Sequence, residues 1–218
     1  MKHSLARRVG AVAAALALCL VGTPARAATP PGVASAGSAD FTGAGRHVVV
    51  PALAPCSVGG PTTATSSPVS DTGIRFGAGR STCETTAVDP PHGTTETRST
   101  AGGAEFELSA LRAAGGPLLK VGRWQVSCTG REHGTAVGWE LEALSGFPGL
   151  PRDIPTDYRH EVTSATGAVL AVAVFSEVLL PDPNDGSLTV NLIHLRFTEA
   201  SGVAGEVVVG SASCSPTP

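Results

Sequence analysis

The sequence is short of charge and lacks the local motifs that most often carry catalysis. Asp, Glu, Lys and Arg make up 15% of its 218 residues, against about a quarter in an average globular chain. It contains no Gly-x-Ser-x-Gly, no His-Glu-x-x-His and no Cys-x-x-Cys segment. Such segments are typical of α/β-hydrolases, zinc peptidases and structural zinc sites. We therefore expect no catalytic residues, no cofactor site and no metal site.

Long apolar runs are also absent beyond the N-terminal region. The apolar stretch at residues 168–175 is eight residues long, whereas a helix needs about 20 residues to cross a bilayer. We therefore expect no transmembrane segment in the mature protein.

Residues 1–27 have the features of a secretory signal peptide. Basic residues near the start precede an apolar run at residues 9–21, and Ala25 and Ala27 form a small-x-small cleavage pattern. The mature protein is therefore expected to begin near Ala28 and to be secreted.

Two variants of this signal need separate consideration. Cys19 could belong to a lipoprotein box, but Leu18 stands before it where a small residue is expected, so we disfavour lipidation. The pair Arg7 and Arg8 resembles a twin-arginine signal, but such pairs also occur in ordinary signal peptides. The pair leaves the export route open.

Cleavage makes the chain more acidic and leaves an even number of cysteines. The leader removes four of the 15 basic residues and none of the 18 acidic ones, so the net charge becomes −7. This balance argues against nucleic acids and anionic membranes as partners, because both require a basic surface. Four cysteines in an exported chain indicate two disulfides, for which three pairings exist.

The residue pattern divides the mature chain into a tail and a single domain. Residues 28–40 are rich in Ala, Pro, Gly and Ser, and we expect a flexible tail there. Residues 41–218 form the domain, of which residues 41–103 read as loop-rich. Apolar and polar residues alternate over residues 104–214, as in half-buried strands. The fold class predicted is all-β, an antiparallel sandwich or barrel-like domain.

A β-hairpin is expected from residues 168–180 and 187–198. The Pro-Asp-Pro-Asn-Asp-Gly segment between them is typical of a turn, and it lacks the full pattern of a calcium loop. We expect Leu180 to face Ser187, because this register gathers the large apolar side chains on one face.

The other face of this hairpin is mixed, and it is our candidate partner face. Its members are Phe175, Leu192, His194 and Arg196. In this register Glu177 lies opposite Val190, about 13 Å along the strand from His194. An acid–base pair needs about 3 Å, so we expect an exposed His194 without a catalytic role.

Four glutamates alternate along two of the expected strands. Glu105 and Glu107 lie two positions apart, as do Glu140 and Glu142. A glycosidase uses two carboxyl groups about 5 to 10 Å apart. Each pair falls on the outer face of a strand, so a solvated surface is the favoured interpretation.

Three motifs in the C-terminal half occur in a familiar order. They are Trp124-Gln-Val-Ser-Cys128-Thr, Pro183-Asn-Asp-Gly-Ser-Leu-Thr-Val-Asn-Leu-Ile-His194 and Gly205-Glu-Val-Val-Val-Gly-Ser-Ala-Ser-Cys214. Together they resemble the choice-of-anchor P family of exported, mostly actinobacterial proteins, over roughly residues 104–214. The resemblance implies secretion and a Cys128–Cys214 disulfide. It implies no enzyme activity.

The remaining cysteines, Cys56 and Cys83, lie outside the matched region. Their pairing follows from parity alone, and we favour it because the closing strand and the N-terminal loops are then held separately. The family's variable C-terminal sorting signal is not matched, since only Ser-Pro-Thr-Pro follows Cys214.

Three functional hypotheses follow from these patterns. The first is a non-catalytic secreted or cell-envelope-associated structural or interaction domain, with a cell-wall component or another envelope protein as candidate partner. The second is a secreted hydrolase whose site is assembled from distant residues. The third is an extracellular ligand-binding module that uses the mixed hairpin face.

Overall fold

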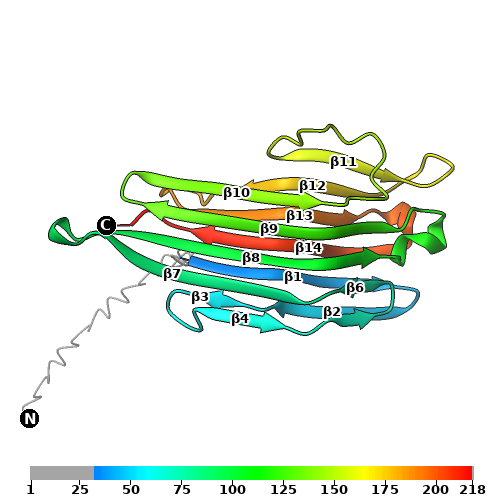
Figure 1. Cartoon of the computed structure of the whole chain (residues 1–218). Coiled ribbons are helices and arrows are strands. Elements are labelled where there is room, and N and C mark those ends of the chain that lie inside the picture. The colour runs from blue at the N-terminus through cyan, green and yellow to red at the C-terminus, as the bar shows by residue number, and fades with distance from the viewer. Residues whose placement is uncertain (1–31, 218) are drawn as a thin grey trace, which may run out of the picture.

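Two antiparallel β-sheets pack face to face and form a sandwich. The computed structural model describes residues 32–217, and Figure 1 shows the two layers with their long strands running side by side. The all-β prediction is confirmed, and of its two forms the structure is the sandwich. Within residues 32–217, no helix has the length and apolar character needed to cross a membrane.

The first sheet, sheet A, has the strand order β11-β12-β13-β14-β1-β2, with β3 beside β1. Its strands are β1 (Gly32–Gly43), β2 (Arg46–Leu53), β3 (Cys56–Ser57), β11 (Tyr158–Thr163), β12 (Val169–Leu179), β13 (Leu188–Phe197) and β14 (Val203–Cys214).

The second sheet, sheet B, has the order β10-β9-β8-β6-β5, and β7 pairs with both β8 and β4. Its strands are β4 (Thr63–Ser66), β5 (Val69–Asp71), β6 (Ile74–Phe76), β7 (Gly79–Asp89), β8 (Thr94–Leu108), β9 (Leu119–Arg131) and β10 (Gly134–Glu142). Three short 3₁₀ turns complete the described chain: η1 (Pro90–His92), η2 (Ala110–Ala114) and η3 (Glu199–Ser201).

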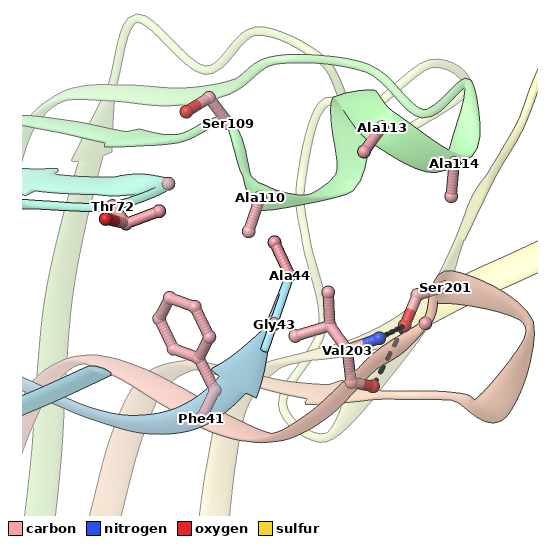
Figure 2. A pocket seen from close by; sticks show the side chains of 12 residues that line it. Phe41, Gly43, Ala44, Thr72, Ser109, Ala110, Ala113, Ala114, Ser201 and Val203 are labelled. Carbon is pink, nitrogen blue, oxygen red and sulfur yellow. Dashed lines mark hydrogen bonds between the residues drawn. The ribbon is translucent and has the colours of Figure 1, made fainter. Parts of the chain in front are cut away.

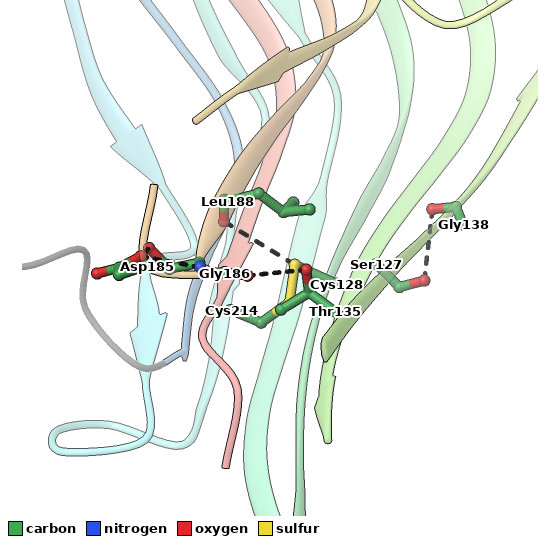
Figure 3. Close-up of a disulfide and its surroundings, with 9 residues drawn as sticks. Ser127, Cys128, Thr135, Gly138, Asp185, Gly186, Leu188 and Cys214 are labelled. Carbon is green, nitrogen blue, oxygen red and sulfur yellow. Dashed lines mark hydrogen bonds between the residues drawn. A yellow bond between two sulfur atoms is a disulfide. The ribbon is translucent and has the colours of Figure 1, made fainter. Parts of the chain in front are cut away.

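Both disulfides form as expected, and both join one sheet to the other. Cys128 of β9 is bonded to Cys214 of β14, as Figure 3 shows, and Cys56 of β3 is bonded to Cys83 of β7. All four cysteines are buried in the core between the sheets. Beside the first disulfide, the Thr135 hydroxyl donates to the backbone carbonyl of Gly186 at 3.1 Å. The sandwich is therefore cross-linked through its interior, and the second disulfide does more than hold a loop.

The expected flexible tail is wrong where the structure describes it. Residues 28–31, like the whole signal peptide, lie outside the described residues, but residues 32–40 belong to β1 between β14 and β2. Ala34, Ala36 and Ala39 of this strand are buried in the core. These side chains are too small to give a strong hydrophobic pattern, although they fit the narrow space between the packed sheets.

The segment expected to be loop-rich also contains long strands. Most of residues 84–103 lies in β7 and β8, joined by η1 at the Pro90-Pro91 step. These strands are rich in Thr, which is β-branched and favours the extended backbone even where no apolar alternation marks it.

The hairpin is confirmed, but its register is shifted by one residue. Glu177 pairs with Asn191 and Phe175 pairs with Ile193, so the predicted register is wrong. Ser176 has a positive φ of 50°, and the pairing skips it and Leu192 opposite.

The backbone is kinked at Ser176. Before and after this kink, the side chains that face the core do not follow the same every-second-residue pattern. On β13, both Leu192 and its neighbour Ile193 are fully buried in the core. In an unkinked strand, adjacent side chains point to opposite faces. The kink therefore leaves Asn191 and His194 on the same outer face, with two core residues between them.

Candidate functional site

A network of polar side chains lies on the outer face of sheet A, centred on Glu177. The Glu177 carboxylate accepts hydrogen bonds from Asn191 Nδ2 at 3.0 Å and from Arg196 at 2.7 Å, and its Oε2 lies 2.6 Å from His194 Nδ1. The Ser211 hydroxyl donates to Asn191 Oδ1 at 2.9 Å. The network links β12, β13 and β14 side by side.

His194 is bound on both sides of its ring. Its second nitrogen, Nε2, lies 3.0 Å from Glu206 Oε2. The expectation of an exposed His194 far from Glu177 is wrong, because the shifted register brings Glu177 within hydrogen-bonding distance and buries both residues.

The environment of Glu177 favours its charged form. Burial by itself raises the pKa of this carboxyl group, but the hydrogen bonds from Asn191, His194 and Arg196 outweigh burial and hold the pKa below its ordinary value. A buried carboxylate that is fully paired in this way serves to fix its neighbours in place. Since both nitrogens of His194 already face carboxylates, the contact is structural and offers no unoccupied base.

The candidate partner face is divided by the structure. Phe175 and Leu192 are fully buried in the core, so their assignment to the outer face is wrong. His194 and Arg196 do lie on the outer face, where Arg196 is partly exposed. The error arises because the kink at Ser176 interrupts the strict alternation of inward and outward side chains on which the assignment relied.

A row of outward side chains crosses sheet A directly beside the network. Strand pairing aligns them in the order Glu161, Val172, Arg196, Glu206, Asp40 and Val49. Glu206 and Asp40 were not singled out from the sequence, although the alternation in residues 205–213 would have placed Glu206 outward. Val49 ends the row with 53% of its surface exposed, and a shallow hollow of about 320 Å³ lies beside it. We call this set the sheet A row.

A second hollow opens on the outer face of sheet B. Its volume is about 580 Å³, and it extends from β4 across β7, β8 and β9 to β10. The charged and amide side chains that line it are Arg80, Arg123, Gln125, Glu140 and Glu142. We call it the sheet B groove. It contains the Glu140–Glu142 pair, both exposed as the sequence predicted, whereas Glu105 and Glu107 pair with Arg75 and Lys120 elsewhere.

A third hollow, of about 490 Å³, lies at one end of the sandwich and is shown in Figure 2. Phe41 and Val203 lie on one side and the alanines of η2 on the other. Its lining carries no charged side chain, and the Ser201 hydroxyl there is already bonded to backbone atoms.

The turn at residues 181–186 uses its polar side chains internally. Asn184 Oδ1 accepts from the backbone N–H of Gly186 at 2.8 Å, and Asp185 Oδ1 accepts from that of Ser187 at 2.9 Å. Among residues 32–217, no group of three or more His, Cys, Asp or Glu side chains is arranged to hold a metal ion.

Comparisons with known proteins gave no relatives: no family model, no curated protein and no solved structure matches the chain.

Proposed function

We propose that this chain is exported and that the mature protein is a non-catalytic binding module, released outside the cell or associated with its envelope. Residues 1–27 support export, and so do the two buried disulfides, since such bonds persist in oxidising compartments. Membership of the choice-of-anchor P family is part of the proposal. Its three motifs lie on β9, around β13 and on β14, and the Cys128–Cys214 bond that the resemblance implied is formed.

The observation that carries the binding role is the sheet A row. Its charged members are three acidic residues, Glu161, Glu206 and Asp40, and one basic residue, Arg196. The exposed Val49 adds an apolar contact at the end of the row. A partner with a basic surface and an apolar side chain would complement this pattern, and charge complementarity of this kind speeds and orients association.

The buried network beside the row prepares the row for binding. Arg196 is held by Glu177, and Glu206 by His194, so two charged side chains of the row are fixed before a partner arrives. Side chains that are already ordered lose less conformational entropy on association. The energy spent on burying Glu177 and His194 thus supports a defined outer surface.

Fractionation of the producing cells tests the proposal. The protein should be recovered from wall, membrane or medium with an N-terminus near Ala28, and raised salt should release any envelope-bound fraction, because salt screens exposed charges. Glu161→Lys and Asp40→Lys together reverse the charge of the two outermost acidic residues of the sheet A row. This double variant should move the protein from the envelope-bound fraction to the soluble fraction.

A matched variant separates docking from net charge. Glu84→Lys with Glu132→Lys makes the same change in total charge, but on exposed positions of sheet B and its β9–β10 turn. Equal loss of binding in both double variants would refute the sheet A row as the docking surface. Recovery of the protein inside the cell with residues 1–27 intact would refute export.

A further inference from the structure

We propose that the sheet B groove binds an uncharged, hydroxyl-rich oligosaccharide. The groove lies on the opposite face of the sandwich from the sheet A row, so this inference does not depend on the protein partner proposed above.

The groove is built around one row of paired residues. Strand pairing aligns Thr65, Arg80, Gly102, Gln125 and Glu140 across β4, β7, β8, β9 and β10. Gly102 has no side chain, and in this row it stands between Arg80 and Gln125. The backbone at Gly102 therefore forms the floor of a hollow with polar groups on both sides.

The next row along the sheet adds one more residue of each charge. Arg123 of β9 lies opposite Glu142 of β10 in the strand register, and both line the groove. The groove thus holds two arginines and two glutamates, so its formal charge is balanced. A ligand with a strong net charge of either sign would gain little from such a site.

These charged groups are available to a ligand. Among the ion pairs of residues 32–217, none includes Arg80, Arg123, Glu140 or Glu142. Several other charged groups of sheet B form ion pairs: Arg75 with Glu105, Lys120 with Glu107 and Arg131 with Glu96. The groove therefore gathers four charged side chains without an ion pair around one hollow.

The chemistry of the lining fits sugar hydroxyl groups. Guanidinium groups only donate hydrogen bonds, carboxylates only accept them, and a carboxamide does both. A hydroxyl group both donates and accepts, so adjacent sugar hydroxyls satisfy all three kinds of side chain. Apart from Trp124, which is buried in the core, the apolar side chains in the lining are small, as with Ala78 and Ala104, so a peptide would find few places to bury its apolar groups.

The size and surroundings of the groove agree with this ligand class. Its volume of about 580 Å³ lies within the range of about 300–1,000 Å³ that is usual for small-ligand sites. The neighbouring outward row on the same strands, Thr82, Thr100 and Ser127, carries hydroxyl groups and extends the polar surface beyond the groove.

Calorimetric titration with defined oligosaccharides tests the inference. The probes are cellohexaose, chitohexaose and maltohexaose as neutral chains and trigalacturonate as an anionic one, added to the folded protein purified from producing cells. At least one neutral chain should bind, and Arg80→Ala and Gln125→Ala should each weaken that binding about tenfold, as expected for a lost hydrogen bond in a polar site.

The matched control is Arg98→Ala. Arg98 is an exposed arginine on the same face of β8, outside the groove lining, and its replacement should leave the dissociation constant within about twofold. Circular dichroism of each variant checks that the sandwich is intact. Binding of trigalacturonate alone, binding that both groove variants leave unchanged, or no binding of any neutral chain at millimolar concentration would overturn the proposal.

Discussion

Replacing Glu177 by glutamine should destabilise the sandwich, because the substitution removes the charge on which the outer network of sheet A depends. The carboxylate contacts three partners, Asn191, His194 and Arg196, and it is 93% buried in the fold. Glutamine keeps the shape but places an N–H₂ donor where one carboxylate oxygen faces a donor. At least one former hydrogen bond then becomes a contact between two donors.

The expected loss is about 3 kcal/mol at neutral pH, since a hydrogen bond to a charged group contributes about 1.5–3 kcal/mol and an unpaired buried partner adds its own desolvation cost. We discount the contact with Arg196, whose side chain is 44% exposed and therefore screened by water. For a chain of this size such a loss lowers Tm by about 6–12 °C.

Denaturant unfolding at neutral and acidic pH measures this effect. The pKa of Glu177 is lowered from 4.5 in the folded protein, so its charged form stabilises the fold above pH 4.5. That contribution disappears as the pH falls below 4.5 through the lowered pKa. The difference between the wild type and Glu177→Gln should therefore be full at neutral pH and shrink in acid.

Glu161→Gln is the matched control, because Glu161 is an exposed glutamate on the same face of sheet A. It should change the unfolding free energy by less than about 0.5 kcal/mol. If Glu177→Gln were as mild as Glu161→Gln, the hydrogen bonds of the network would not support the fold, and our account of the outer face of sheet A would be refuted.

Further predictions concern a buried histidine and the two disulfides. Burial holds the pKa of His160 below 6.5, while nearby Glu161 opposes this shift only in part, and the buried Nε2 has no hydrogen-bond partner among the described residues. The fold should therefore keep its full stability above pH 6.5 and lose part of its unfolding free energy as the pH falls below 6.5. Unfolding measured at pH 7.5 and 5.5 should show this loss in the wild type and not in His160→Leu. Opening the disulfide that closes 86 residues, by Cys214→Ser with Cys128→Ser, should cost about 4.6 kcal/mol from loop entropy, against about 3.6 kcal/mol for the disulfide that closes 27. The second double variant is Cys56→Ser with Cys83→Ser, and equal losses in the two double variants would contradict the loop-entropy explanation.

The sequence predicted the fold class and the cysteine pairing better than the individual strands. Alternation around Trp139 and Leu141 marks a half-buried strand, and the structure has β10 there. Strand β1 escaped prediction because its buried side chains are mostly alanines, which give little hydrophobic contrast with the glycines and serines beside them. The cysteine pairing came from the family resemblance and from parity, neither of which depends on strand boundaries.

The outer network could not be predicted from alternation. A strict period of two places Leu192 and His194 on the same face, but the positive φ of Ser176 changes the parity between them. Nothing in the local sequence of β12 marks Ser176 as a kink, since serine is common in ordinary strands and turns. The contact between Glu177 and His194 depends on that kink, so it becomes visible only in three dimensions.

The most direct test of the central claim, that sheet A docks a basic partner, is site-specific photo-crosslinking in producing cells. A photoreactive side chain would replace Val49 at the end of the sheet A row or, as the control, Val88 on β7, which is similarly exposed at 61%. We predict a discrete crosslinked product from position 49 that disappears when Glu161→Lys and Asp40→Lys are added, and none from position 88. The same products from both positions, or a product from position 49 that survives the charge reversal, would contradict the claim.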